Sequence, residues 1–485
     1  MLFNSYEYIF FFLPVTFFLY FYINKKNTEY ARMFLVFASL FFYSWWNIKY
    51  LSLILISMVV NFTVGKELSR HSENKREYNA KKLLGFGMVF NLALLGYFKY
   101  SNFFIQNINR VLHSHIELLH LALPLAISFY TFQQIAYLVD SYRHETREYS
   151  FWHYALFVTF FPQLIAGPIV HHKEMMPQFA QKQNAKINPY NVALGIFIFF
   201  MGLFKKVVIA DTFAQWATQG FDVARSLNML EAWSASLSYT FQIYFDFSGY
   251  TDMAIGAAFL FNIKLPINFF SPYKAGNIQE FWRRWHITLS SFLKDYLYIP
   301  LGGNQKGKIR TYSNLFITFL LGGIWHGAGW TFVVWGALHG IALVIHRIWK
   351  ELGFKLPFIL GWFITFMFVN IAWVFFRANN FHDAIKVLQG MFGGTFVLPR
   401  ETWTVVASFI KEHSVIVGKW SNLYLHESGM FWWIIAGFVV VLFFPNSMQF
   451  KEKFKTNWFY LVLTLLFSIS LFLLNRKSEF IYFNF

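Results

Sequence analysis

The chain has 485 residues, of which 56% are hydrophobic and 13% are charged, and it contains no cysteine. Soluble domains carry about 25% charged residues, so this composition excludes an ordinary water-soluble fold; the lack of cysteine excludes disulfides and cysteine-bound zinc. The formal net charge is +17. We interpret it as positive charge that lies in the loops and follows the positive-inside rule. We therefore expect no nucleic-acid partner.

Apolar stretches long enough to cross a bilayer recur along the whole chain, since about 20 apolar residues span the hydrocarbon core. Nine strong candidates lie at 8–23, 31–46, 50–65, 83–98, 191–204, 332–346, 358–376, 431–444 and 459–474. Weaker candidates lie at 121–139, 152–169, 233–262 and 285–300. The pattern predicts an all-α polytopic membrane protein with roughly 11 to 14 embedded segments, and residues 1–485 are expected to form one membrane domain.

Two basic loops set the expected orientation. Residues 24–32 and 66–82 are rich in lysine and arginine and are separated by two spans. Both loops should therefore face the cytoplasm, with the N-terminus outside it. The first apolar stretch has no basic n-region and no small-residue cleavage site, so it is expected to be a retained span. The polar insertion at 395–428 is expected to lie on the bilayer surface.

Between residues 239 and 340 the apolar runs are interrupted by Asp, His, Arg, Gly and Pro. Ionisable residues inside membrane segments usually face the bundle interior or a water-filled cavity, so a site is expected in this block. Asp246 and Asp252 are six residues apart and would lie on different faces of a continuous helix. Ser248 and Gly249 between them indicate a turn or break, where each aspartate would bind backbone groups.

The stretch "NIQEFWRRWHITLSSFLKDYLYIPLGG" (277–303) carries a denser set. Trp282 and His286 are four residues apart and are predicted to share a helix face. A glutamate at position 280 is placed to pair with Arg283 or Arg284. These arginines fit either an interfacial helix with snorkelling side chains or a site for lipid phosphates or a phosphate-bearing donor.

The stretch "GGIWHGAGW" (322–330) places His326 among four glycines. Glycine permits bends and the close approach of backbones and ligands, and histidine supplies a base that titrates near neutral pH. His339 follows 13 residues later; on one continuous helix it would point away from His326, so we interpret it as a packing residue. No histidine spacing typical of a metal site occurs here, and no metal is expected.

These motifs occur in a familiar order. "FWRRWHITLSSFLKDYLYIPLGG" followed by "LLGGIWHGAGWTFVVWGALHG" resembles the membrane-bound O-acyltransferase (MBOAT) family, as do "FFPQLIAGPIV", "GLFKKVVIAD" and "YFDFSGYTDMAIG". The specific motifs cover about 160–340, and the hydropathy profile extends over the whole chain. The match is to the bacterial branch that contains alginate O-acetylases, peptidoglycan O-acetyltransferases and D-alanine transferases of teichoic acid.

The resemblance implies a ring of tilted helices around a central funnel, in which a cytoplasmic acyl donor meets an acceptor from the other face. It places the family's invariant histidine on His326, as general base, and its second motif histidine on His286, which would position a substrate or stabilise an oxyanion. Candidate substrate-binding residues are Trp282, Arg283, Arg284, Trp285, Trp325 and Asp246.

The resemblance also implies partners. The donor would be acetyl-CoA or another acyl thioester, with no tightly bound cofactor. The final acceptor would be an exported polysaccharide, reached through a separate periplasmic SGNH/esterase-like protein. The expected location is the bacterial inner membrane, in contact with its lipid.

The C-terminal segment 457–485 contains a last apolar stretch followed by "RKSEFIYFNF". It resembles a small membrane peptide of teichoic acid D-alanylation, whose tyrosine is proposed to carry the acyl group, so Tyr482 is a candidate acyl relay. Alternatively, Tyr482 belongs to the aromatic belt, and Arg476 and Lys477 place the tail in the cytoplasm. The fused tail favours the acetylating branch over a D-alanyl transferase.

Two readings without acyl transfer remain open at this point. A polysaccharide or lipid transporter would explain the spans and the charged central block, although the sequence shows no inverted repeat of the kind many transporters have. A membrane scaffold that recruits a periplasmic enzyme is the other. Both predict that His326 is dispensable for chemistry.

Overall fold

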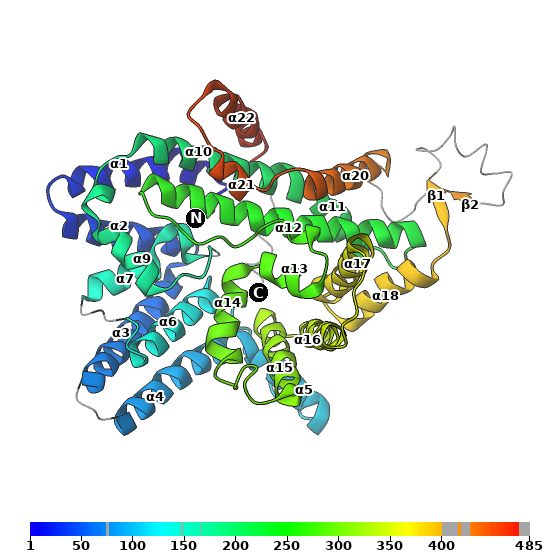
Figure 1. Cartoon of the computed structure of the whole chain (residues 1–485), viewed down its shortest axis with the longest axis horizontal. Helices are drawn as coiled ribbons and strands as arrows, with labels where there is room; N and C mark the ends of the chain where they lie inside the picture. Colours follow the sequence, from blue (N-terminus) through cyan, green and yellow to red (C-terminus); the bar gives the residue numbers. More distant parts are fainter. Residues whose placement is uncertain are drawn as a thin grey trace. The chain divides into compact units, whose positions relative to one another are not determined.

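The computed structural model describes residues 1–73, 77–146, 148, 150–165, 167–399, 416–418 and 427–474. Within these ranges the chain is helical apart from one pair of short parallel strands, β1 (Val397–Pro399) and β2 (Ile416–Gly418). The chain divides into two compact units, and Figure 1 follows its course. Unit 1 comprises Met1–Phe204, Gly249–Asn268 and Lys451–Phe485; unit 2 comprises Lys205–Ser248 and Phe269–Phe450.

Unit 1 is built mainly from the N-terminal helices. Its α-helices are α1 (Leu13–Asn24), α2 (Thr28–Ser44), α3 (Leu51–Glu73), α4 (Glu77–Leu95), α5 (Ser101–Leu112), α6 (Ile127–Tyr142), α7 (Phe151–Thr159), α8 (Phe161–Leu164), α9 (His172–Ala180), α10 (Pro189–Phe204) and α22 (Trp458–Ser468). Shorter π and 3-10 segments are η1 (Glu7–Phe12), η2 (Ile48–Tyr50), η3 (Gly96–Tyr100), η4 (Lys182–Ala185) and η9 (Ile469–Leu473).

Unit 2 holds the central block of the sequence. Its α-helices are α11 (Asp211–Thr218), α13 (Ile278–Arg284), α14 (Ile287–Leu293), α15 (Lys308–His326), α16 (Trp330–Glu351), α17 (Phe358–Arg377), α18 (Phe381–Gly393) and α20 (Glu427–Phe443). Its shorter segments are η5 (Lys205–Ala210), η6 (Gln219–Val223), η7 (Pro272–Lys274) and η8 (Lys294–Tyr298). Two helices belong partly to each unit: α12 (Met229–Leu260) and α21 (Ser447–Glu452).

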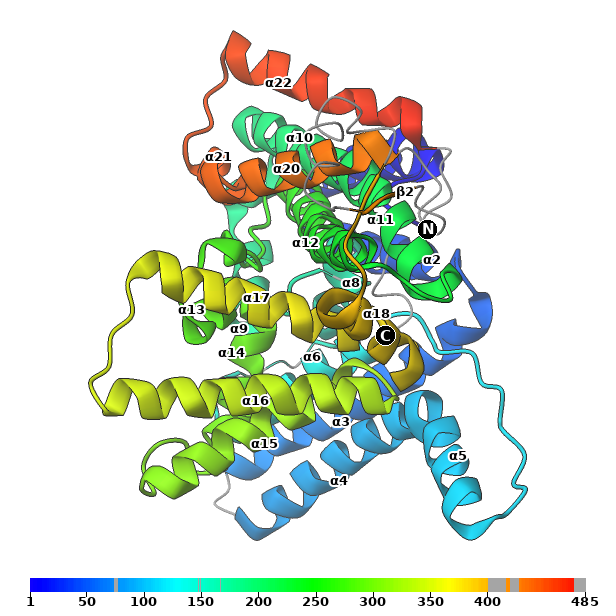
Figure 2. The same cartoon turned by 90° about the vertical axis from the view of Figure 1, so that its right-hand side faces the viewer.

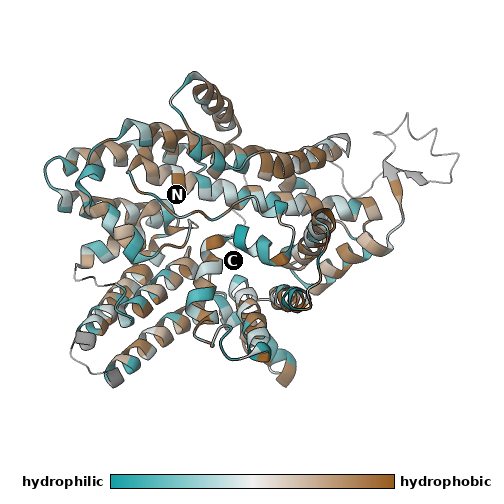
Figure 3. Ribbon diagram, viewed as in Figure 1, coloured by the Kyte–Doolittle hydropathy of each residue, from teal (hydrophilic) through white to brown (hydrophobic). Residues whose placement is uncertain are grey.

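Among the residues that the structure describes, six helical stretches are long and apolar enough to cross a membrane: Glu7–Asn24, Ile48–Arg70, Asn79–Leu112, Pro189–Val223, Trp330–Glu351 and Phe358–Arg377. Two shorter apolar helices cover Gly429–Phe443 and Trp458–Leu473. Large apolar side chains point outward from these helices; Ile359, for example, is 77% exposed, and Figure 3 shows how strongly hydrophobic α10, α17 and α20 are. Such exposure suits lipid and not water. The prediction of an all-α polytopic membrane protein is confirmed.

Polar side chains inside unit 1 join two of these spans, α3 and α4, to the neighbouring helix α6. Asn61 of α3, Asn91 of α4 and Gln134 of α6 are all fully buried. The Asn91 side-chain amide donates to Asn61 Oδ1 at 2.6 Å, and Asn61 donates to Gln134 Oε1. Hydrogen bonds between membrane helices give helix pairs a specific register that apolar packing alone does not supply.

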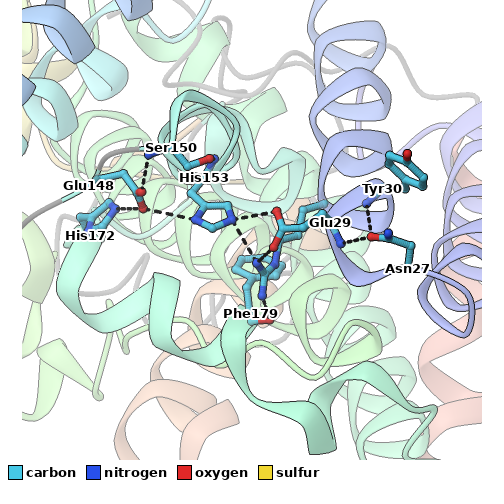
Figure 4. A network of polar contacts seen from close by, with 9 residues as sticks. Asn27, Glu29, Tyr30, Glu148, Ser150, His153, His172 and Phe179 are labelled. Atoms are coloured by element: carbon cyan, nitrogen blue, oxygen red, sulfur yellow. Dashed lines mark hydrogen bonds and ion pairs between the residues drawn. The ribbon is translucent and has the colours of Figure 1, made fainter.

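A second polar network in unit 1 joins the start of α2, the start of α7 and the start of α9 (Figure 4). His153 lies at its centre, with Nε2 3.0 Å from Glu29 Oε2 and 3.0 Å from Arg32 Nη1. Glu148 Oε2 lies 3.2 Å from His172 Nε2 and 3.6 Å from His153 Nδ1. Arg32, Glu148, His153 and His172 border a cavity of about 400 Å³.

The network predicts a pH window for stability. Neither Glu148 nor His153 lies in one of the six spans. Burial, the largest influence, raises the pKa of Glu148, but hydrogen bonds from His153, His172 and the Ser150 backbone outweigh it and lower the pKa from 4.5 to about 2. Its hydrogen bond with Glu148 raises the pKa of His153 above 6.5, against burial and with help from Glu29.

The carboxylate therefore stabilises the fold above pH 4.5 and loses this contribution as the pH falls toward 2. The histidine stabilises it fully below pH 6.5 and loses its contribution as the pH rises through the folded pKa. We therefore expect the network to contribute most to the thermal stability of the protein in detergent between pH 4.5 and pH 6.5. Glu148→Gln should weaken the fall of Tm on both the acidic and the basic side of this window. The control Glu174→Gln changes an exposed carboxylate and should leave the dependence of Tm on pH as it is. An unchanged dependence in Glu148→Gln would contradict the assignment.

Helix α12 corrects one prediction from the sequence. It runs without a break from Met229 to Leu260, so the expected turn at Ser248–Gly249 is wrong. Asp246 does not cap a broken helix, because Lys206 Nζ lies 2.7 Å from its Oδ1. The same ammonium lies 2.8 Å from Asp211 Oδ1, and all three side chains are buried. Pairing a buried charge in this way removes the need for backbone partners.

Glycines bring α15 and α16 into direct backbone contact. The two helices lie side by side in Figures 1 and 2 and fold back on one another. A Cβ added to Gly323 would lie 2.5 Å from the Phe332 carbonyl oxygen, and one added to Gly336 would lie 2.6 Å from that of Phe319. The space that we expected Gly323 to leave for a ligand is therefore filled by the neighbouring helix.

Candidate active site

Three histidines of unit 2 lie in one buried aromatic region. His326 is the last residue of α15, because Gly327 adopts an extended conformation and ends the helix. Its ring lies 4.8 Å from that of Trp325, 5.0 Å from that of Trp335 and 5.2 Å from that of Phe376. The side chain is 3% exposed. The histidine that the sequence predicts to be the base therefore lies at the end of a helix, and aromatic side chains surround it.

His339 lies on α16 and is fully buried. The prediction that it points away from His326 assumed one continuous helix and is wrong, because the chain turns back at 327–329. The His339 ring lies 4.8 Å from that of Trp335, which also contacts His326. The Trp282 indole N–H donates to His339 Nδ1 at 3.1 Å. We call Trp282, Trp335, His339 and Trp373 the aromatic cluster.

His286 is positioned differently from the expectation. Helix α13 ends at Arg284, so Trp282 and His286 do not share a helix face. His286 itself has φ +43°, a left-handed conformation that is uncommon outside glycine and costs free energy. This turn buries the ring completely, 4.8 Å from the Phe247 ring and 6.5 Å from the Phe269 ring. A strained backbone retained at a buried histidine is typical of functional sites.

Aromatic contacts connect the regions of His286 and His326. Phe269 contacts Trp285 with ring centroids 5.1 Å apart, and Trp285 contacts Trp373 at 4.9 Å. Trp373 stacks on Trp335 at 5.8 Å. Trp285, predicted to bind substrate, is only 1% exposed and is part of this packed interior.

A large cavity lies on the other side of Trp282. Its volume is about 960 Å³, and its lining combines four cations with apolar side chains. The cationic residues are Arg283, Lys294, Arg347 and Lys350; the apolar ones include Trp282, Leu315, Phe319 and Leu343; Glu351 contributes the carboxylate. We call this the basic cavity. It suits a ligand with an anionic end and an apolar or weakly polar end.

Of the two arginines predicted to bind substrate, Arg283 lines this cavity and Arg284 does not. Arg283 is exposed and lines it. Arg284 instead donates to Glu280 Oε1 at 2.6 Å, which settles the pairing that the sequence left open. Glu280 also accepts from the Gly276 backbone N–H at 2.8 Å, so this pair holds the start of α13 in place.

The sequence analysis missed Arg347 and Lys350. Both lie in the last turns of α16, where Leu343, Arg347 and Lys350 follow the helical spacing of one face. That spacing was visible in the sequence. Its connection with Arg283, 64 residues earlier, was not, because it depends on the packing of α13 against α16.

Two predicted elements cannot be placed. Tyr482 lies outside the described residues, as does most of the polar insertion at 395–428. Within the described ranges, no group of three or more His, Asp or Glu side chains is arranged to hold a metal ion.

Comparisons with known proteins identify the family of this chain. Residues 140–382 match the profile described as "MBOAT, membrane-bound O-acyltransferase family". The chain is 48% identical to a peptidoglycan O-acetyltransferase of Helicobacter pylori over 100% of its own length and 98% of that protein's. It is 42% identical to a probable alginate O-acetylase of Pseudomonas aeruginosa, covering 82% of this chain and 76% of the relative.

A teichoic acid D-alanyltransferase of Streptococcus thermophilus is 30% identical over 52% of this chain and 68% of its own. The profile match includes α13 to α17 and therefore His286, His326, the aromatic cluster and the basic cavity. Full-length identity to the first relative extends the likeness to both units. The chain is a multi-pass membrane enzyme that belongs to the membrane-bound O-acyltransferase family.

Proposed function

We propose that this protein transfers an acetyl group from a cytoplasmic thioester to a hydroxyl group, for the O-acetylation of an exported cell-envelope polysaccharide. One observation carries the proposal: a single side chain, Trp282, lines the basic cavity and also contacts the aromatic cluster beside His326. An anion-binding entrance therefore ends close to a buried base. The names of the peptidoglycan O-acetyltransferase and the probable alginate O-acetylase support acetyl as the group and a polysaccharide as the final acceptor.

The chemistry needs little more than orientation and a base. His326 takes the proton of the acceptor hydroxyl while its oxygen attacks the thioester carbonyl carbon. The carbon–sulfur bond then breaks, and the proton passes to the leaving thiolate, which gives an ester and a free thiol. His286 would position one of the substrates. Because a thioester is already activated, holding both reactants in line supplies much of the acceleration.

Acetyl-CoA fits the basic cavity by charge and size. Its phosphates would meet Arg283, Lys294, Arg347 and Lys350, and its pantetheine arm would lie along the apolar wall toward Trp282. A cavity of about 960 Å³ is at the upper end of those that hold cofactor-sized ligands. By the positive-inside rule, its cations belong on the cytoplasmic face of a bacterial inner membrane, with the chain's N-terminus on the opposite side.

The acceptor side requires a second protein. We propose that a separate periplasmic esterase-like enzyme completes the transfer to the sugar, and that Tyr482 carries the acetyl group toward it. The aromatic ending "FIYFNF" supports this role for Tyr482. D-alanyl transfer is the second reading, and the shorter alignment to the teichoic acid enzyme makes it the weaker one.

The cavity assignment is tested with the double variant Arg347→Gln/Lys350→Gln. Loss of charged contacts worth about 1.5 kcal/mol should raise KM for acetyl-CoA about tenfold and leave kcat nearly unchanged. The Glu351 carboxylate keeps Lys308 at 3.0 Å and Tyr312 at 2.9 Å, so the change leaves no stranded charge.

The matched control is Lys355→Gln, an exposed cation that does not line the cavity. KM should be measured by thioester hydrolysis in detergent at two salt concentrations, because screening weakens phosphate contacts. An unchanged KM in the double variant would place the donor elsewhere. D-alanyl thioester consumed in preference to acetyl-CoA would favour the second reading.

A further inference from the structure

The hydrogen bond between Trp282 and His339 fixes where the His339 ring carries its proton. An indole N–H can only donate, so His339 Nδ1 must accept. An accepting Nδ1 carries no proton, and the neutral ring therefore carries its proton on Nε2. His339 is thus oriented as a hydrogen-bond donor at Nε2 and is not a second general base.

Three donors of the aromatic cluster have no partner. His339 Nε2, Trp335 Nε1 and Trp373 Nε1 are buried, and no hydrogen-bonding group of the described residues pairs with them. Their rings touch one another: His339 and Trp335 at 4.8 Å, Trp335 and Trp373 at 5.8 Å, and His339 and Trp373 at 6.4 Å. Buried N–H groups are normally paired, and three in one cluster require a common explanation.

The chemistry of these donors selects their ligand. With its Nδ1 occupied by Trp282, His339 offers only an N–H, and an indole ring offers only an N–H as well. The complementary group is an oxygen that accepts and does not donate. A carbonyl oxygen meets this requirement, whereas an acceptor hydroxyl with its own proton meets it less well.

The position of the cluster connects this preference with the reaction. Trp335 contacts both His339 and His326, so the donors lie beside the proposed base. Trp282 joins the cluster to the basic cavity. An acyl group that passes Trp282 from the cavity reaches the donors and His326 together.

We propose that His339 is a catalytic residue, whose Nε2–H binds the carbonyl oxygen of the acyl group and stabilises the oxyanion that forms there. This assignment rests on the proposed acyl transfer. As the acceptor oxygen attacks, the electron pair of the C=O π bond moves onto the carbonyl oxygen, and the His339 N–H stabilises that charge. The pair returns when the carbon–sulfur bond breaks. The Trp335 and Trp373 indoles complete the donor set.

The decisive variants are His339→Phe and His339→Gln. The phenylalanine keeps a ring of similar size and removes the donor; the glutamine keeps an N–H near the position of Nε2. Loss of one oxyanion donor typically lowers kcat about 100- to 1,000-fold. We expect this loss with little change in KM for His339→Phe, and at least tenfold recovery of kcat in His339→Gln. The exposed His382→Phe serves as the control.

Binding gives a readout that does not depend on turnover. Calorimetry would compare a ketone analogue of acetyl-CoA, with CH2 in place of sulfur, with S-ethyl-CoA, which lacks the carbonyl. One hydrogen bond should make the wild type bind the ketone about fivefold more tightly. His339→Phe should lose most of this preference, and Trp373→Phe, which removes a different donor, should lose a smaller part of it.

Equal binding of the two analogues by the wild type, or a full preference in folded His339→Phe, would overturn the role of His339 and leave the acyltransferase intact. Binding of neither analogue by the wild type would overturn the proposed donor, and this assignment with it. If His339→Phe fails to fold, the preference retained or lost in Trp373→Phe decides the donor set.

Discussion

His326→Ala is expected to lower acetyl transfer by about 100- to 10,000-fold, the range that a general base contributes. The side chain is 3% exposed and is enclosed by the rings of Trp325, Trp335 and Phe376. No exposed base can take its place without reorganising that wall. The fold should survive, because alanine is compatible with the end of α15.

The measurement uses purified protein in detergent with radiolabelled acetyl-CoA, following both thioester hydrolysis and covalent label on the chain. His382→Ala, on the exposed start of α18, is the matched control and should keep full activity. Turnover indifferent to His326→Ala would remove the catalytic reading and restore the transporter or scaffold.

The same experiment separates the relay from the enzyme. If Tyr482 carries the acetyl group, Tyr482→Phe should lose the covalent label while thioester hydrolysis continues. His326→Ala should lose both. A label that persists in Tyr482→Phe would leave the acyltransferase in place and assign the carrier to another residue.

Gly336→Ala is expected to push α15 and α16 apart, to lower Tm and to abolish activity, because His326 and His339 lie on these two helices. The new Cβ would lie 2.6 Å from the Phe319 carbonyl oxygen and 3.0 Å from the Gly323 Cα, and both atoms belong to the backbone. No rotamer change relieves such a contact. Overpacking of this kind typically costs about 1–3 kcal/mol, which corresponds to a fall of roughly 1–3 °C in Tm for a chain of 485 residues.

The control is Gly85→Ala in α4, where an added Cβ meets nothing within 4 Å. Because alanine favours helix more than glycine, this variant should keep or slightly raise Tm. Both are read from thermal unfolding in detergent, with hydrolysis of acetyl-CoA measured beside it. A Gly336→Ala protein with wild-type Tm and activity would show that the two helices are able to move apart without cost.

The sequence alone predicted the class of protein, which is confirmed, and it proposed His326 as the base, which stays a prediction. Span-length apolar runs predicted the membrane helices, and the odd context of "IWHGAG" singled out His326. The sequence did not predict that α12 is an unbroken helix, since a Ser248–Gly249 pair is typical of a helix break. In the structure Lys206 neutralises Asp246, and Gly249 lets α10 approach, with a Cβ on Gly202 falling 2.5 Å from the Gly249 carbonyl oxygen.

The wrong predictions for His286 and His339 both assumed a continuous helix where the chain turns. No glycine or proline marks the end of α13, so the turn at His286 gave no signal. To predict the position of His339, one has to know that the chain reverses at 327–329 and brings α16 back along α15. The basic cavity joins residues from α13, η8 and α16, and a single sequence does not report which distant segments meet.

The buried triad of Lys206, Asp211 and Asp246 has a consequence for the biogenesis of the protein. A lysine in the middle of a membrane helix costs about 2.5–3.5 kcal/mol on insertion scales. Asp211 leaves the ribosome only five residues after Lys206 and is available to it at once. Asp246 follows 40 residues after Lys206. The stretch Pro189–Val223 therefore carries a counterion for Lys206 into the bilayer with it. Helix α12 contains no lysine or arginine, so the cation that pairs with its buried Asp246 is supplied by the earlier segment. Insertion of α12 thus depends on the helix that entered the membrane before it.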